Sequence, residues 1–267
     1  MIAASDTVSL APGVGLGQGA LEDRVRGHAW PLNSSGAFVL ARAGRPVVRE
    51  LAEAFSLPVE VARADVLHFV WLLNGLALVN VESQMSRPRR FTEWLQLAVR
   101  LAPAGTMPAP VARRRALDTR TARRAFVSSL AATLPRACLV ASAATVLAVH
   151  FAVILGAGLV GPVLIGLGTG LGLGLHEAAH AALLRGVPSA LVIRGRRTYV
   201  LHAPVTPGRR AAVALGGPLA VSALGVGLVL GGIVAAAPAL AAAGWPLAAH
   251  ALALTVAGGD GRVACGL

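Results

Sequence analysis

Two histidines four residues apart, His176 and His180, stand on either side of Glu177 in the stretch His176-Glu177-Ala178-Ala179-His180. Residues four apart lie on one face of a helix, so both imidazoles can reach one zinc ion. The glutamate between them can then act as general base toward a water that the zinc activates. The alternative is a pair of ordinary helical histidines beside a solvated glutamate. The apolar flanks, from about Pro162 to Leu184, argue against it, because an ionisable residue at membrane depth is costly and marks function.

A third ligand has to come from elsewhere in the chain, because a catalytic zinc ion takes three protein ligands and keeps one position open for water. From residue 119 onward the sequence holds only two acidic residues, Glu177 and Asp260. Asp260 stands in Gly258-Gly259-Asp260-Gly261-Arg262, at the end of another apolar run. The two histidines and Asp260 are therefore the predicted zinc ligands, and Glu177 is the predicted catalytic base. The alternative is a polar cluster that holds no metal.

Two further histidines, His150 and His250, lie inside apolar runs. Either could assist the metal site, but a hydrogen-bonded histidine of a helix bundle is the more common case, and we expect that role for both. The two cysteines, Cys138 and Cys265, form neither a zinc-binding spacing nor a disulfide framework. They are expected to be small apolar residues.

The composition is typical of a membrane protein. Of the 267 residues, 55% are hydrophobic and only 4% are aromatic. The formal net charge is +12, all 24 basic residues are arginine, and the excess lies C-terminal to residue 85. Cytoplasmic placement of basic segments and contact with anionic lipid explain this charge better than nucleic-acid binding, for which no recognition motif is present.

Four apolar segments are predicted to cross the membrane, and about 20 residues are needed for one crossing. They are residues 137–158, 162–184, 215–237 and 245–258, of which the last is short. Arginine-rich segments precede the first span and fill the loop from Arg185 to Arg210, which places both on the cytoplasmic side. We therefore expect a multi-pass protein of the cell (cytoplasmic) membrane. Within that loop, Ala190–Ile193 and Tyr199–Leu201 are strand-like, and an exposed edge there could receive an extended substrate.

The first 85 residues predict a small α+β domain with a winged-helix-like order of elements. Strands are expected at Thr7–Leu10, Ala20–Trp30 and Leu76–Val81. Three helices are expected between the second and third strands, at 32–40, 47–55 and 58–75, with Asn33 or Ser34 as the first N-cap. The N-terminus has no features of a signal peptide, so this domain is expected to lie in the cytoplasm.

Residues 86–133 predict a basic amphipathic connector. One helical face carries apolar side chains, namely Phe91, Trp94, Leu95, Ala98 and Leu101, which suits a helix on the membrane surface. Further arginines follow at 113–115, 120, 123 and 124. A solvated charge run explains these arginines about as well as lipid contact does.

The N-terminal residues resemble the PqqD-like family, the peptide-recognition elements of ribosomal peptide modification. The matching residues are Leu32-Asn33 with Gly36, Val47-Val48-Arg49-Glu50-Leu51, and Asp65-Val66 with Phe69, Leu72 and Leu76. The resemblance covers residues 7–82 and implies that a precursor's leader peptide adds as a strand beside the sheet and packs on the third helix. The alternative is a generic winged helix that binds DNA or only packs, and the acidic balance of this segment argues against DNA.

The second half resembles the site-2-protease family of intramembrane zinc metallopeptidases (peptidase M50). Three features carry the resemblance: the histidine motif in a membrane helix, Gly216-Gly217-Pro218-Leu219 opening the next span, and Asp260-Gly261 closing the last. It implies the same assignments, with His176, His180 and Asp260 as zinc ligands and Glu177 as catalytic base. The family usually has an asparagine and a proline upstream of its aspartate, where this chain has Leu252 and Thr255, and relatives usually continue beyond the site.

Together these features predict a mainly α membrane protein, with about four transmembrane helices at 134–267 behind the 1–85 domain and the 86–133 connector. The expected function is an intramembrane zinc endopeptidase that removes the leader of a ribosomally made, modified peptide. A regulatory protease that cuts a membrane-bound anti-sigma-type protein is one alternative. A non-catalytic membrane chaperone or docking subunit for peptide maturation or export is another, favoured by the departures from the family pattern. The expected partners are precursor peptide and membrane lipid, and the sequence leaves the oligomeric state open.

Overall fold

The computed structural model describes residues 2, 6–41, 58–82, 110–156, 158–195 and 197–254, with isolated positions between 86 and 99. The chain is mainly helical with small sheets, as the sequence predicts. It divides into two compact units, one of Met1–Ala116 with Ala190–Ala203 and one of Leu117–Ser189 with Pro204–Leu267. Residues 190–203 therefore belong to the same compact unit as the N-terminal residues. The predicted domains, which are continuous stretches of sequence, do not include this grouping.

Short antiparallel strands build much of the N-terminal unit. β1 (Thr7–Leu10) pairs with β5 (Val79–Glu82), and β2 (Val14–Leu16), β3 (Ala20–Asp23) and β4 (His28–Pro31) form a second sheet in that order. The single strand predicted at 20–30 is thus two strands. The turn between them contains Gly27 at φ 67°, a backbone conformation that glycine adopts without strain.

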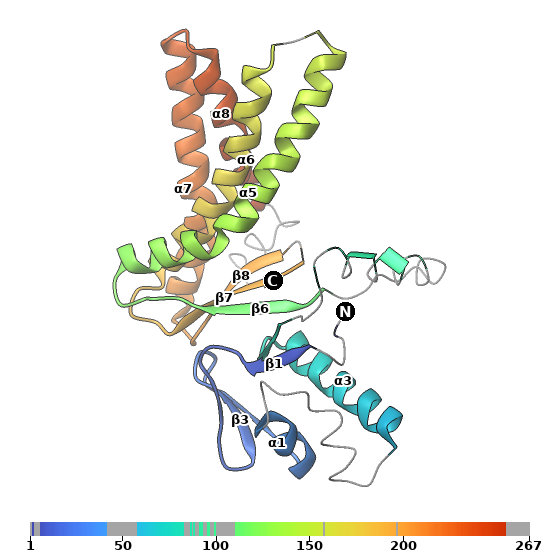
Figure 1. Cartoon of the computed structure of the whole chain (residues 1–267). Coiled ribbons are helices and arrows are strands. Elements are labelled where there is room, and N and C mark those ends of the chain that lie inside the picture. Colours follow the sequence, from blue (N-terminus) through green and yellow to red (C-terminus); the bar gives the residue numbers. More distant parts are fainter. Residues whose placement is uncertain are drawn as a thin grey trace. The chain divides into compact units, whose positions relative to one another are not determined.

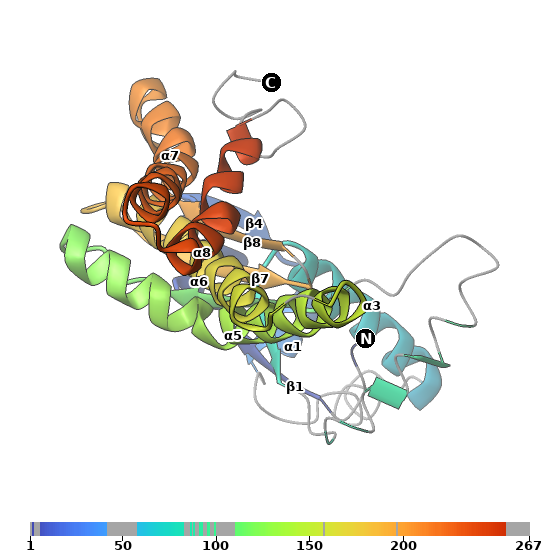
Figure 2. The ribbon, with the colours of Figure 1, turned by 90° about the horizontal axis from the view of Figure 1, so that it is seen from above.

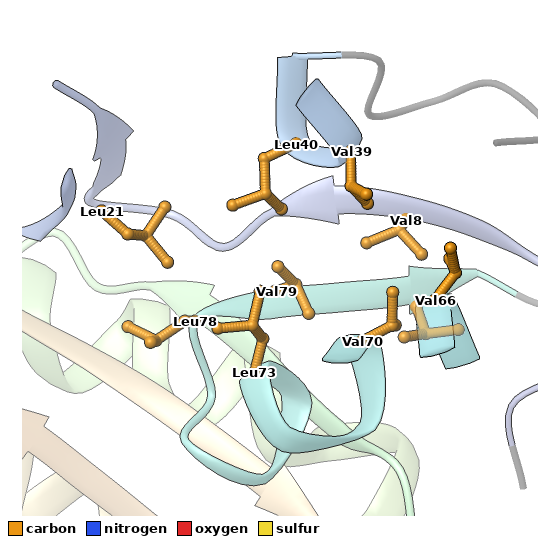
Figure 3. Close-up of a cluster of buried hydrophobic side chains, with 10 residues drawn as sticks. Val8, Leu21, Val39, Leu40, Val66, Val70, Leu73, Leu78 and Val79 are labelled. Atoms are coloured by element: carbon orange, nitrogen blue, oxygen red, sulfur yellow. The ribbon is translucent and has the colours of Figure 1, made fainter. Parts of the chain in front are cut away.

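Two helices, α1 (Ser34–Ala41) and α3 (Val59–Gly75), pack on the β1–β5 pair. Asn33 caps α1, because its Oδ1 accepts a hydrogen bond from the backbone N–H of Gly36 at 2.7 Å. Figure 3 shows the apolar core between these elements, and its buried members are Val8, Leu21, Val39, Leu40, Val66, Val70, Leu73, Leu78, Val79 and Val81. The helices predicted at 32–40 and 58–75 are confirmed. The helix predicted at 47–55 lies outside the described residues.

A third sheet joins segments that are far apart in the sequence. It consists of β6 (Ala112–Ala116), β7 (Ser189–Arg194) and β8 (Arg197–His202), in that order. β6 runs antiparallel to β7, with Arg113 opposite Ile193. β7 and β8 occupy the two strand-like stretches predicted in the loop. β6 was not predicted, because its arginine triplet resembles a solvated charge run.

Side chains of the N-terminal unit hold β6 in place. Asn74 accepts a hydrogen bond from the N–H of Ala112 and donates one to its carbonyl oxygen, both at 2.8 Å, and Asn80 does the same with Arg114, also at 2.8 Å. The buried guanidinium of Arg114 donates to both carboxylate oxygens of Asp23, at 2.7 and 2.8 Å. Burial alone would raise the pKa of Asp23, but the hydrogen bonds and charge of Arg114, together with the backbone N–H groups of Val25 and Arg26, hold the pKa below 3.8.

Among the described residues, four helices make up most of the second unit. They are α5 (Ala122–Ile154), α6 (Val160–Leu183), α7 (Pro207–Val234) and α8 (Pro238–Ala248), and α8 continues as the 3₁₀-helix η2 (Ala249–Leu254). α6 contacts α5, α7 and α8, and Figures 1 and 2 show it between α5 and the α7–α8 pair. By length and composition, α5 and α7 could each cross a membrane.

The helix bounds differ from the predicted spans at several ends. α5 begins at Ala122, well before residue 137, because the Thr121 side chain caps it by accepting from the N–H of Arg124. α6 and α7 overlap the spans predicted at 162–184 and 215–237. Where a span was predicted at 245–258, the structure has the end of α8 and then η2, and residues 255–258 lie outside the described part.

The five alternate glycines of α6 let its neighbours approach closely on two sides. A Cβ at Gly166 would collide with the backbone of Thr145 in α5. A Cβ at Gly168 would lie 2.6 Å from the carbonyl oxygen of Ala243 in α8. Glycines four apart form a stripe along a helix, so one stripe faces α5 and the other faces α8. The helix that carries the histidine pair is therefore fixed between its neighbours.

Candidate metal centre

His176 and His180 lie one turn apart near the end of α6, and both are buried, at 9% and 7% exposed. They continue the stripe that Gly168 and Gly172 begin, because each member is four residues from the next. Their Nε2 atoms are 3.0 Å apart. Two nitrogens on one tetrahedral zinc ion are about 3.3 Å apart, given Zn–N bonds of about 2.0–2.1 Å. The prediction that both rings share one helix face is confirmed, and their role as ligands stays a prediction.

The ring of His180 is oriented by α7. Its Nδ1–H donates a hydrogen bond to the carbonyl oxygen of Val213 at 2.6 Å, since a carbonyl can only accept. A neutral imidazole with its proton on Nδ1 presents the lone pair of Nε2, which is how an oriented histidine ligates a metal. Gly217 in α7 leaves the space for this ring, because a Cβ there would lie 2.5 Å from Nε2 of His180. From the sequence, Gly217 was singled out only as part of a stretch that resembles the site-2-protease family, and no contact was predicted for it.

A third imidazole, that of His250 in η2, lies beside the pair. Its ring centre is 5.5 Å from that of His176, compared with 4.6 Å between the rings of His176 and His180. The Nδ1–H of His250 donates to the carbonyl oxygen of Pro246 at 3.1 Å, as expected for a bundle histidine. His150 is exposed on α5 and lies against Phe151.

Glu177 is 6% exposed, although it lies in an apolar helix. Its charge interacts with that of Arg136 in α5. A buried carboxylate is costly unless a cation or hydrogen bonds compensate it, and Arg136 supplies part of that compensation. An ionised Glu177 is the state that a general base requires. The sequence did not identify Arg136 as a partner of Glu177, because the spacing of residues in α5 does not indicate which side chains face α6.

Asp260, the predicted third ligand, lies outside the described residues. Within the described part of the chain, no group of three or more His, Cys, Asp and Glu side chains is placed so that it could hold a metal ion. The two histidines of α6 nevertheless fit zinc, in the separation of their Nε2 atoms and in the carbonyl that orients one ring. The geometry therefore brings together two of the three predicted ligands, and it does not describe the third.

No protein-family model, no curated protein and no solved structure matches this chain. The resemblances to the PqqD-like and site-2-protease families therefore rest on the residues quoted from the sequence.

Proposed function

We propose that the chain is an intramembrane zinc endopeptidase that recognises a peptide precursor and removes its leader. The observation that carries the proposal is the buried pair His176 and His180, whose Nε2 atoms face each other 3.0 Å apart with Glu177 between them in the sequence. An ionisable side chain at membrane depth is costly, so a buried pair of imidazoles inside an apolar helix favours a functional role.

His176, His180 and a third ligand would hold the ion, and zinc there would supply Lewis acidity that lowers the pKa of water and polarises a carbonyl group. Glu177 is proposed to take the proton of the attacking water and later give it to the leaving amine. Val213 fixes the ring of His180 through its carbonyl oxygen. The charge of Arg136 in α5 interacts with that of Glu177 and would help to position the base.

The bundle is proposed to lie in the membrane with four spans and a cytoplasmic N-terminal unit. Large apolar side chains point away from the bundle, and on α5 they include Leu139, Val146 and Val153 at 70, 70 and 66% exposed. Such an extended apolar surface suits lipid better than water. The arginine-rich segments beside the spans favour cytoplasmic placement of the N-terminus.

The N-terminal unit is proposed to capture the leader on α3. Its apolar residues Val61, Trp71 and Leu72 are between 46 and 47% exposed. An extended peptide could pack on these side chains and gain main-chain hydrogen bonds from a strand edge. β8 offers one such edge, because among the described residues it is the terminal strand of its sheet.

The test is to purify the full chain in detergent, measure its zinc content, and follow cleavage of precursor peptides by mass spectrometry. Glu177→Gln should keep the zinc and abolish cleavage, because the amide cannot accept the proton. His176→Ala should lose both. Cleavage retained in Glu177→Gln would refute the mechanism, and a chain without zinc would favour the chaperone or docking alternative.

The regulatory alternative is distinguished by the same preparation. Removing residues 1–85 would also remove Asp23, Asn74 and Asn80, the partners of β6, so point variants are cleaner. Trp71→Ala with Leu72→Ala should weaken cleavage of leader-bearing precursors and spare a leaderless membrane substrate. Equal rates on both substrates would favour the regulatory protease.

A further inference from the structure

We propose that His250 supplies the third nitrogen ligand of the metal site, an assignment that rests on the proposed zinc site of His176 and His180. Nothing in the sequence motif points to it, because η2 is remote from the motif along the chain. The packing of α8 on α6, and of η2 on α7 and α8, brings the ring there.

The separation of the rings fits a shared ion. Two imidazoles on one tetrahedral zinc ion have ring centres about 5 Å apart, because each Zn–N bond of about 2.0–2.1 Å adds to the distance from nitrogen to ring centre. The observed distances are 5.5 Å for His176 to His250 and 4.6 Å for His176 to His180. Both lie close to that value. No three described side chains already stand as a ligand set, so the imidazole of His250 has to reorient for its Nε2 to reach an ion held by His176 and His180.

The ring of His250 has a built seat on α6. Gly172 lies one turn before His176 on the same stripe, and a Cβ there would lie 2.5 Å from Cε1 of His250 and 3.2 Å from each ring nitrogen. Any larger residue at Gly172 would therefore push the imidazole away. A glycine is therefore required at position 172 if the ring of His250 is to lie against α6 next to His176.

The hydrogen bond of His250 also selects a ligating form. The carbonyl oxygen of Pro246 accepts from Nδ1–H at 3.1 Å, so a neutral ring keeps its lone pair on Nε2. His180 is oriented in the same way by the carbonyl oxygen of Val213, at 2.6 Å. Two of the three imidazoles are thus oriented by a backbone carbonyl, the arrangement usual for metal-ligating histidines.

The experiment uses the full chain in detergent, loaded with zinc or cobalt. Zinc affinity is measured by competition with a chelator for wild type, His250→Ala, Gly172→Ala and Asp260→Ala. Two matched controls are His150→Ala, which removes an exposed histidine, and Gly227→Ala, whose Cβ would meet nothing within 4 Å. His250→Ala should weaken zinc binding by at least about 100-fold, beyond the 10–100-fold typical of losing an outer hydrogen-bond partner. Gly172→Ala should weaken it about 10-fold by displacing the ring, while both controls stay within about twofold of wild type.

His250→Cys keeps the test valid if the alanine variant fails to fold. A thiolate that binds cobalt gives a sulfur-to-metal charge-transfer band in the near ultraviolet, and a cysteine with a merely structural role does not. The band is expected in His250→Cys and not in wild type, which already contains Cys138 and Cys265.

The inference is overturned if His250→Ala binds zinc as tightly as His150→Ala, or if the cobalt band is missing in a folded His250→Cys that binds the ion. In either case, if the single variants His176→Ala and Asp260→Ala each lose zinc, the proposed peptidase stands and Asp260 is the third ligand. If wild type itself binds no zinc, the proposed function fails together with the inference.

Discussion

Replacing Arg114 by methionine should destabilise the N-terminal unit, because it leaves the carboxylate of Asp23 buried without its main partner. The side chains of both residues are 0% exposed, and two hydrogen bonds of 2.7 and 2.8 Å join them. Methionine keeps much of the volume of arginine and removes only its charge and donors. The neighbouring Arg113 is exposed on the same strand, so Arg113→Met is a matched control.

The expected loss follows from what Asp23 retains. Breaking a buried ion pair by removing one partner costs about 3–5 kcal/mol. Asp23 still accepts the N–H groups of Val25 at 2.9 Å and Arg26 at 3.3 Å, and the Arg26 guanidinium lies 3.7 Å away. These groups favour the lower end, about 3 kcal/mol, which is about a 100-fold change in an equilibrium constant. Because an apolar pair can replace a buried ion pair, adding Asp23→Leu to Arg114→Met should recover part of the loss.

Hydrogen exchange of the full chain in detergent measures this locally. Peptides from β3 and β6 should lose about 100-fold in protection in Arg114→Met, while peptides from α7 should keep theirs. Arg113→Met should leave both sets unchanged. If the two methionine variants exchange alike in β3 and β6, the ion pair contributes nothing to holding β6, and the reasoning fails.

Three further predictions concern acid, zinc and an amide. The folded pKa of Asp23 lies below its unfolded value of 3.8, so the stability from its ion pair is complete above pH 3.8 and is lost as the pH falls through the folded pKa. Hydrogen exchange of β3, measured over a series of acidic pH values, should show this loss of protection only at low pH. Loss of protection that begins near neutral pH would contradict the prediction. Gly217→Ala should weaken zinc binding about 10–100-fold by displacing the ring of His180, a proposed ligand, whereas Gly227→Ala should not, as chelator competition will show. Asn74→Ala should cost about 1–3 kcal/mol in local stability, since it leaves the buried N–H and carbonyl of Ala112 without that partner; unchanged exchange in β6 would contradict this.

Local patterns predicted the elements of this chain better than their pairing. Asn33 capped its helix and Thr7–Leu10 formed its strand, because caps and strand patterns depend on nearby residues. The strand at Ala112–Ala116 was missed, because an arginine triplet becomes a strand only when β7 pairs with it and Asp23 neutralises its central charge. Both β7 and Asp23 are distant from this strand in the sequence, and no local pattern predicts either contact.

The sequence alone determined that His176 and His180 share one face of an apolar helix, because a spacing of four fixes this for any α-helix. Only the tertiary structure brought His250 beside them and gave Gly172 and Gly217 their purpose as seats for imidazole rings. The physical reason is that helix periodicity acts within one segment, whereas the choice of neighbouring helix depends on close packing of surfaces that the chain brings together only on folding.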